Sequence, residues 1–243
     1  INLNIFLNKN YFLGLLIMFL FGTILWTPLI LYPPMMQDLQ NYPEDLTGLF
    51  LALRGFGTLC GSTLLVFLNK KLDPRFILSL GFLLQGIAGF YMSHFDINLS
   101  AFELAWTNAL AGLGVGFVWV PLTLITFNTI DKKFLNEASA FWHLIRNVGS
   151  SISISITIAL VIRSTAINYA DLSSFISIFG DSTSVMPLKG TTAPGDVDSL
   201  SGLSKEISRQ SEMIGYINAF HLYYWIAFSI IPLVWLAPLK PQN

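Results

Sequence analysis

The sequence predicts an all-α integral membrane protein whose six transmembrane helices form one bundle. Hydrophobic residues make up 53% of the 243 residues and charged residues only 11%, whereas about a quarter of the residues in a soluble domain are charged. The mean hydropathy is +0.63. The apolar residues gather into runs of about twenty, the length that a helix needs to cross about 30 Å of hydrocarbon. We therefore expect a lipid bilayer around this chain.

Six apolar runs with polar residues between them define the expected spans, at residues 11–31, 46–68, 76–92, 102–127, 138–162 and 219–239. After the first run, Pro33, Pro34 and Pro43 stand among carboxylates and predict a break, because such a segment cannot continue a helix through lipid. Residues 1–162 thus hold five spans, and residues 219–243 hold the last span and a tail.

Residues 163–218 form the one long polar segment, which we expect outside the membrane. Its middle, Gly180 to Asp196, is rich in turn-forming residues. Beyond it, apolar residues recur at helical spacing among polar ones, at Leu200, Leu203, Ile207 and Ile214. This pattern predicts an amphipathic helix near residues 198–217, resting on the bundle or on a partner.

The basic residues predict the orientation, because short cytoplasmic loops collect Lys and Arg. One side of the alternating six-span arrangement carries Lys9, Lys70, Lys71, Arg75, Lys132, Lys133 and Lys240, and the short loops on the other side carry none. Both termini of this multi-pass chain should therefore lie in the cytoplasm. The first residue is Ile1 and no signal peptide follows, so we expect a fragment or a truncated reading frame.

Several classes of function find no support in the sequence. A net charge of −1 gives no general attraction to nucleic acid. The single Cys60 forms no intramolecular disulfide and no cysteine-based metal cluster. The chain lacks a phosphate-binding loop, a His-Glu-x-x-His zinc motif and a nucleophile elbow. We therefore predict no enzyme, no catalytic residue, no metal site and no cofactor.

Two arginines stand about eight residues inside their expected spans, Arg54 in the second and Arg146 in the fifth. A charge on the lipid side costs at least about 2.5–3.5 kcal/mol, so each should face the bundle interior or a wet cavity. In the fifth span, a polar stripe at steps of three or four is formed by His143, Arg146, Ser150, Ser153 and Thr157. Its hydroxyls have two interpretations: helix packing or a cavity lining.

The fourth span aligns Asn108, Gly112, Trp119, Thr123 and Thr126 along one face. Its glycines favour close packing, and Pro121 favours a bend. Trp119 stands at mid-depth, where an indole can either pack or stack on a flat or cationic ligand. Only Glu103 could act as a proton-binding carboxylate there, and a helix cap is its simpler role, so the main proton carrier is expected outside this chain.

Five segments together resemble the EmrB/QacA-type drug:proton antiporters, a fourteen-span branch of the major facilitator superfamily. They are Leu51–Gly57, Leu72–Arg75, Ala111–Thr123, Glu137–Ser151 and Ser208–Phe220. The resemblance covers nearly the whole chain and makes its helices spans nine to fourteen. It implies an inner-membrane exporter of lipophilic or amphiphilic compounds, driven by the proton gradient through alternating access.

The resemblance also implies site residues and partners. Arg54, Arg146 and Asn147 occupy recurring motif positions. Residues 69–75, with Lys70, Lys71, Asp73 and Arg75, resemble a degenerate form of the basic loop that gates access, without its usual glycine-rich, Asp-Arg form. EmrB-like members pair with a membrane-fusion adaptor and an outer-membrane channel, which extends to this chain as a hypothesis.

Two functional hypotheses follow. In the first, this C-terminal half transports a substrate beside a missing N-terminal half. Trp26 and Trp119 would contribute apolar contacts to the substrate, and Asn108 and Ser150 polar ones. A lipid, siderophore or metabolite is an alternative cargo. In the second, the chain is a non-transporting remnant or a membrane scaffold whose external segment binds a partner.

Overall fold

The computed structural model describes residues 6, 8–68, 72–174 and 197–236. Within them the chain forms long helices and no strand, and six helices are long and apolar enough to cross a membrane. They are α1 (Lys9–Pro34), α2 (Glu44–Leu68), α3 (Pro74–Met92), α4 (Ala101–Phe127), α5 (Leu135–Ser174) and α6 (Val197–Trp235), with the short helices η2 (Met35–Leu39) and η3 (Lys132–Phe134). The predicted all-α membrane fold class is confirmed.

Side-chain caps explain where three of the helices begin. The Asn8 side chain accepts a hydrogen bond from the backbone N–H of Asn10 at the start of α1. Asp73 caps α3 in the same way, ahead of Pro74. Ser100 and Glu103 form a reciprocal capping box at the start of α4, so the expected cap role of Glu103 is confirmed. Such caps satisfy N–H groups that have no partner within the helix.

The first helix continues past the proline pair that was expected to end it. Pro28, Pro33 and Pro34 all lie inside α1, which runs directly into the π-helix η2. A π-turn changes the hydrogen-bond step and so accommodates prolines, which donate no N–H. The chain then turns at Asn41, whose φ of 54° is left-handed.

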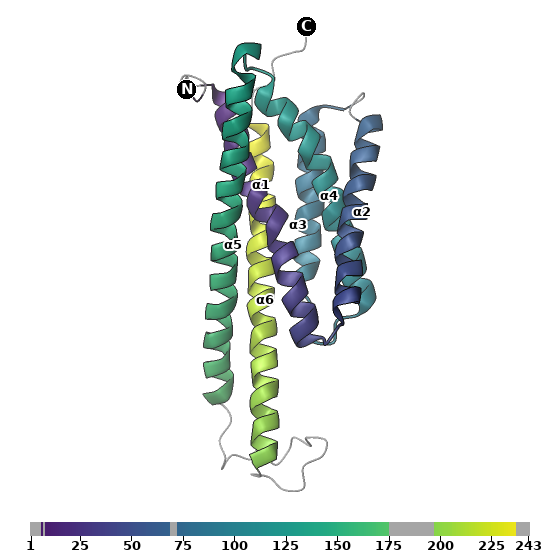
Figure 1. Ribbon diagram of the computed structural model, residues 1–243, viewed down its shortest axis with the longest axis vertical. Coiled ribbons are helices and arrows are strands. Elements are labelled where there is room, and N and C mark those ends of the chain that lie inside the picture. Colours follow the sequence, from purple (N-terminus) through teal and green to yellow (C-terminus); the bar gives the residue numbers. More distant parts are fainter. Residues whose placement is uncertain (1–5, 7, 69–71, 175–196, 237–243) are drawn as a thin grey trace.

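The bundle has two flanks joined by a central helix (Figure 1). On one flank, α4 packs between α2 and α3; on the other, α6 packs against α5. The flanks meet where α3 contacts α6, and α1 crosses between them, contacting α5, α4 and α6. By contrast, α1 and α2 share few contacts.

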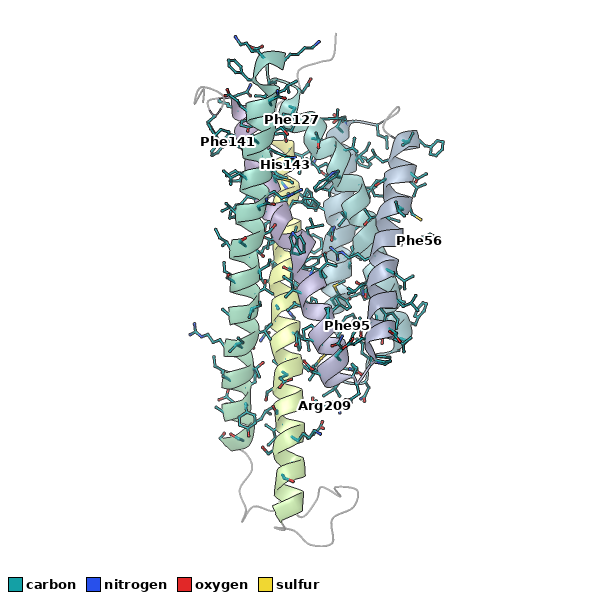
Figure 2. All side chains as sticks on the ribbon, viewed as in Figure 1. Phe56, Phe95, Phe127, Phe141, His143 and Arg209 are labelled. Carbon is teal, nitrogen blue, oxygen red and sulfur yellow. The ribbon has the colours of Figure 1, made fainter. Side chains whose placement is uncertain are left out.

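Close backbone approach holds α2 against α4. A Cβ atom added at Gly112 would lie 2.0 Å from the carbonyl oxygen of Arg54, and one at Gly57 would lie 2.2 Å from that of Ala109. No larger residue fits there without moving a backbone, which agrees with the packing interpretation of the fourth-span glycines. The outer side of α2 is instead apolar and exposed, as Phe56 shows (Figure 2).

The structure differs from the expected polar segment at residues 163–218. Helix α5 continues to Ser174, and the expected amphipathic helix and last span form one continuous helix, α6; residues 175–196 lie outside the described ranges. The two extensions pack on each other: Asn218 donates a 2.6 Å hydrogen bond to Ser164, and the Tyr169 and Ser204 hydroxyls lie 3.1 Å apart. This mutual packing stabilises both segments as helices beyond the apolar runs that predicted the membrane spans.

Candidate functional site

Arg146 and Trp119, predicted separately on two spans, meet in the structure. The guanidinium carbon of Arg146 on α5 lies 5.7 Å from the centre of the Trp119 ring on α4. Both side chains are half-buried. The Arg146 Nε and Nη2 atoms donate hydrogen bonds of 3.3 and 3.2 Å to the side-chain oxygen of the exposed Asn147. We call Trp119, Arg146 and Asn147 the Arg–Trp surface.

An aromatic base supports the Arg–Trp surface from within. The Trp119 ring lies 5.8 Å from the Phe21 ring of α1 and 5.9 Å from the Trp142 ring of α5. Trp142 is buried, and its indole N–H has no hydrogen-bond partner. A tryptophan ring that carries a cation on one side and packs against two further rings is an arrangement that attracts flat or apolar molecules.

The rest of the predicted α5 stripe divides into a packed part and an exposed part. Ser150, Ser153 and Thr157 are buried. Ser150 donates a 2.8 Å hydrogen bond to the carbonyl of Arg146 and lies against Gly22 of α1. His143 is exposed near the end of α5 (Figure 2). The buried hydroxyls of Ser150, Ser153 and Thr157 therefore serve helix packing, whereas Arg146 is half-buried and Asn147 is exposed.

Arg54 occupies a different environment, in the interior of the bundle. Its side chain is 4% exposed, and its Nη2 atom donates a 3.1 Å hydrogen bond to the carbonyl of Leu25 on α1. The phenols of Tyr32 and Tyr223 lie within electrostatic reach of the guanidinium. The expectation that Arg54 faces the interior agrees with this position.

Two hydrogen-bonded pairs complete what we call the buried polar centre: Arg54, Tyr32, Thr107, Gln85 and Tyr223. The Tyr32 and Thr107 hydroxyls lie 3.0 Å apart, and the Tyr223 hydroxyl donates to the Gln85 side-chain oxygen. These four residues come from α1, α4, α3 and α6. Sequence reasoning missed them; Gln85, an amide in the middle of an apolar run, was the signal that could have found them.

The remaining predicted residues stand apart from both groups. Asn108 is fully buried and donates a 3.0 Å hydrogen bond to the carbonyl of Leu104. Trp26 is 42% exposed on α1, and no aromatic contact joins it to Trp119 in the described part of the chain. In the expected gating loop, Asp73 caps α3 and binds the backbone N–H of Arg75, while Lys70 and Lys71 lie outside the described residues.

The described residues contain no group of three His, Cys, Asp or Glu side chains that could hold a metal ion. The chemistry of both groups is therefore that of hydrogen bonds, a fixed positive charge and aromatic surface. Such groups bind and orient a molecule.

The model of the Major Facilitator Superfamily matches residues 14–237. This chain belongs to the major facilitator superfamily. The six apolar helices of the described residues agree with this membership and with a multi-pass protein of the inner membrane.

Members similar to this chain are named for resistance and export. This chain is 23% identical to the multidrug export protein EmrB of Escherichia coli K12 and 25% identical to the probable multidrug resistance protein EmrY of the same strain. It is 22% identical to the fatty acid resistance protein FarB of Neisseria gonorrhoeae. Each match covers 98% of this chain and 47% of the relative. The chain thus spans about half the length of these relatives, and corresponds to a C-terminal half of an EmrB-type protein.

Proposed function

We propose that this chain is the C-terminal half of a proton-coupled exporter of lipophilic or amphiphilic compounds. The observation that carries the proposal is the Arg–Trp surface. It places a half-buried cation over an aromatic base on an otherwise apolar bundle. Apolar and aromatic contacts of this kind have little directionality, which suits a broad range of substrates. The export and resistance names of the relatives favour transport out of the cell.

A complementary N-terminal half supplies the rest of the transport path in this proposal. The relatives are about twice as long as this chain, and alternating access needs two bundles that move against each other. No described carboxylate belongs to the Arg–Trp surface or to the buried polar centre, so the proton-carrying group belongs to the other half. A membrane-fusion adaptor and an outer-membrane channel are further proposed partners.

Dye accumulation in an efflux-deficient bacterial host tests this function. The chain is expressed alone and from its complete reading frame, with and without a proton uncoupler. Reduced accumulation that the uncoupler abolishes supports proton-driven export. Unchanged accumulation from the complete reading frame, with the protein present in the membrane, contradicts it.

A variant series then tests the Arg–Trp surface itself. Trp119→Ala and Arg146→Gln should weaken export about 2- to 30-fold, because a cation–aromatic contact contributes about 0.5–2 kcal/mol. Trp225→Ala and Arg163→Gln are the matched controls, since both side chains are exposed elsewhere on the helices. Equal losses in test and control variants would remove the Arg–Trp surface from the proposal.

One observation favours the scaffold hypothesis as a second candidate. At 1.5 Å per residue, α5 and α6 are each about 60 Å long, twice the hydrocarbon thickness, and Figure 1 shows their paired ends projecting beyond the other helices. Such a projection is suited to binding a partner protein. Shortening it should abolish partner co-purification and leave dye accumulation unchanged if the chain is only a scaffold.

A further inference from the structure

Four aromatic side chains lie together at the surface of the bundle, where α3 ends and α4 begins. We call Phe90, Tyr91, His94 and Trp106 the His94 cluster. The centre of the Phe90 ring lies 4.5 Å from that of His94 and 6.0 Å from that of Tyr91. The Tyr91 ring lies 4.7 Å from the Trp106 ring. Phe90, Tyr91 and His94 are exposed, and Trp106 is half-buried, so the cluster faces what surrounds the protein at this end of the bundle.

A backbone contact fixes which nitrogen of His94 carries the hydrogen. His94 Nδ1 lies 2.7 Å from the carbonyl oxygen of Phe90. A carbonyl oxygen only accepts, so Nδ1 is the donor, and Nε2 of the neutral imidazole is an acceptor. The described residues provide no hydrogen-bond partner for Nε2, since both side-chain contacts of His94 involve Nδ1. His94 thus presents a free acceptor on an exposed ring.

The sequence around the His94 cluster carries negative charge and no basic residue. No Lys or Arg occurs from Phe76 to Asp131. Asp96 follows the cluster along the chain, Glu103 stands in the first turn of α4, and both are exposed. Across the contact with α6, the residues from Ser211 to Leu239 also lack Lys and Arg. The surroundings of the cluster therefore favour a cationic group over an anionic one.

Two neutral donors complete the chemistry of the His94 cluster. Tyr91, which is 49% exposed, has a hydroxyl, and the neighbouring Trp106 has an indole N–H. Side chains of this kind, with an apolar ring and a polar tip, suit the boundary between lipid tails and headgroups. Both can donate to a phosphate oxygen without adding a positive charge. The cluster thus combines one free acceptor, two donors and a cation-attracting ring.

We propose that the His94 cluster binds a membrane lipid whose headgroup carries a primary ammonium beside a phosphate. The ammonium donates an N–H to His94 Nε2 and lies against the Phe90 ring, whose face attracts cations. The phosphate accepts from the Tyr91 hydroxyl and the Trp106 N–H. A trimethylated ammonium keeps the charge but has no N–H to donate, so a lipid that carries it binds less tightly. The site uses neither the Arg–Trp surface nor the buried polar centre, and it does not depend on the proposed export.

Native mass spectrometry of the purified chain in detergent tests the site, with phosphatidylethanolamine, phosphatidylcholine and phosphatidylglycerol of identical acyl chains as probes. The unmodified protein should bind the ethanolamine lipid about 3- to 10-fold more tightly than the choline lipid, the scale of one hydrogen bond. The glycerol lipid, which has no ammonium, should bind least. Equal binding of the ethanolamine and choline lipids would overturn the proposal, and this comparison needs no variant.

Variants then separate the roles within the cluster. His94→Phe keeps a ring and removes the acceptor, so the ratio of ethanolamine to choline lipid should fall toward one. Trp106→Phe removes a donor to the phosphate that both lipids share, so it should weaken both and keep their ratio. His143→Phe is the control, at an exposed histidine far from the end that Phe95 marks (Figure 2). An unchanged ratio in His94→Phe, or an equal fall in His143→Phe, contradicts the site.

Discussion

Arg54 and Arg146 stand at similar depths in their helices, but they differ in burial and in the groups that they contact. Arg54 is buried and donates a hydrogen bond to the backbone carbonyl of Leu25. Arg146 is half-buried over an indole and donates to a neighbouring amide. Water or a substrate can therefore reach Arg146 directly, whereas Arg54 needs a helix movement. The same residue type thus serves a surface contact in one place and an interior charge in the other.

Gly112 should tolerate no side chain, because an added Cβ would lie 2.0 Å from a backbone oxygen of α2. Gly112→Ala is expected to destabilise the protein by about 1–3 kcal/mol through overpacking. Thermal unfolding followed by tryptophan fluorescence in detergent measures this. Gly55→Ala is the matched control: it has open space and should be neutral or stabilising by up to about 1 kcal/mol. Equal stability of the two variants would show that α2 and α4 pack less closely than described.

The capping box at α4 gives a second stability prediction. The Ser100 hydroxyl accepts from the Glu103 backbone N–H, and the Glu103 carboxylate accepts from the Ser100 backbone. Ser100→Ala should therefore cost about 1 kcal/mol, seen as a lower unfolding temperature. Ser100→Asp retains a capping oxygen and should restore most of the loss. A full loss in both variants would contradict the cap explanation.

Helices α5 and α6 are the elements that differ most from the spans predicted from the sequence. Both continue as helices beyond the length of a membrane span, and their extensions contact each other through small and polar residues. Gly215 lies so close to α5 that an added Cβ would be 2.6 Å from the Thr165 hydroxyl. Arg209 also joins α6 to η2 through a 3.0 Å hydrogen bond to the Leu39 carbonyl. The α5–α6 pair therefore behaves as one element anchored to the first helix.

The Ser164–Asn218 hydrogen bond should contribute measurably to this pairing. Interhelical hydrogen bonds in membrane proteins average about 0.6 kcal/mol and reach about 1.7 kcal/mol. A double-mutant cycle of Ser164→Ala and Asn218→Ala should give a coupling in that range, near the upper end because the bond is only 2.6 Å long. The cycle of Tyr169→Phe and Ser204→Ala, with a longer and exposed contact, should give less. A coupling of zero at Ser164–Asn218 would leave the pairing to apolar contacts alone.

Considered as a whole, the molecule has two chemically different ends. The end where α1 begins and α6 finishes also holds Arg75 and the Lys132–Lys133 turn, and the paired extensions of α5 and α6 form the other. Short basic loops favour the cytoplasm. We therefore expect the first end inside the cell and the extensions outside it.

Cysteine labelling measures this orientation, since Cys60 is the one native thiol and Cys60→Ser removes it. In that background, Ser174→Cys should react with a membrane-impermeant maleimide in intact cells. Lys133→Cys should react only after the cells are permeabilised. The reverse pattern would invert the topology, and labelling of both sites in intact cells would mean that the chain does not insert in one orientation.

Hydropathy and the placement of charge predicted that this chain lies in a bilayer as helices and that Arg54 is turned inward. Both predictions rest on the free-energy cost of exposing polar or charged groups to lipid, which depends on each residue and its neighbours in the sequence. The same pattern could not predict that Trp119 lies under Arg146, that Ser150 is packed against α1, or that Tyr223 joins Gln85 to Arg54. Those contacts depend on the rotation and crossing of whole helices, which only their mutual packing defines. Hydropathy also shows where lipid ends rather than where a helix ends, so the continuation of α5 and α6 emerged only from their contact with each other.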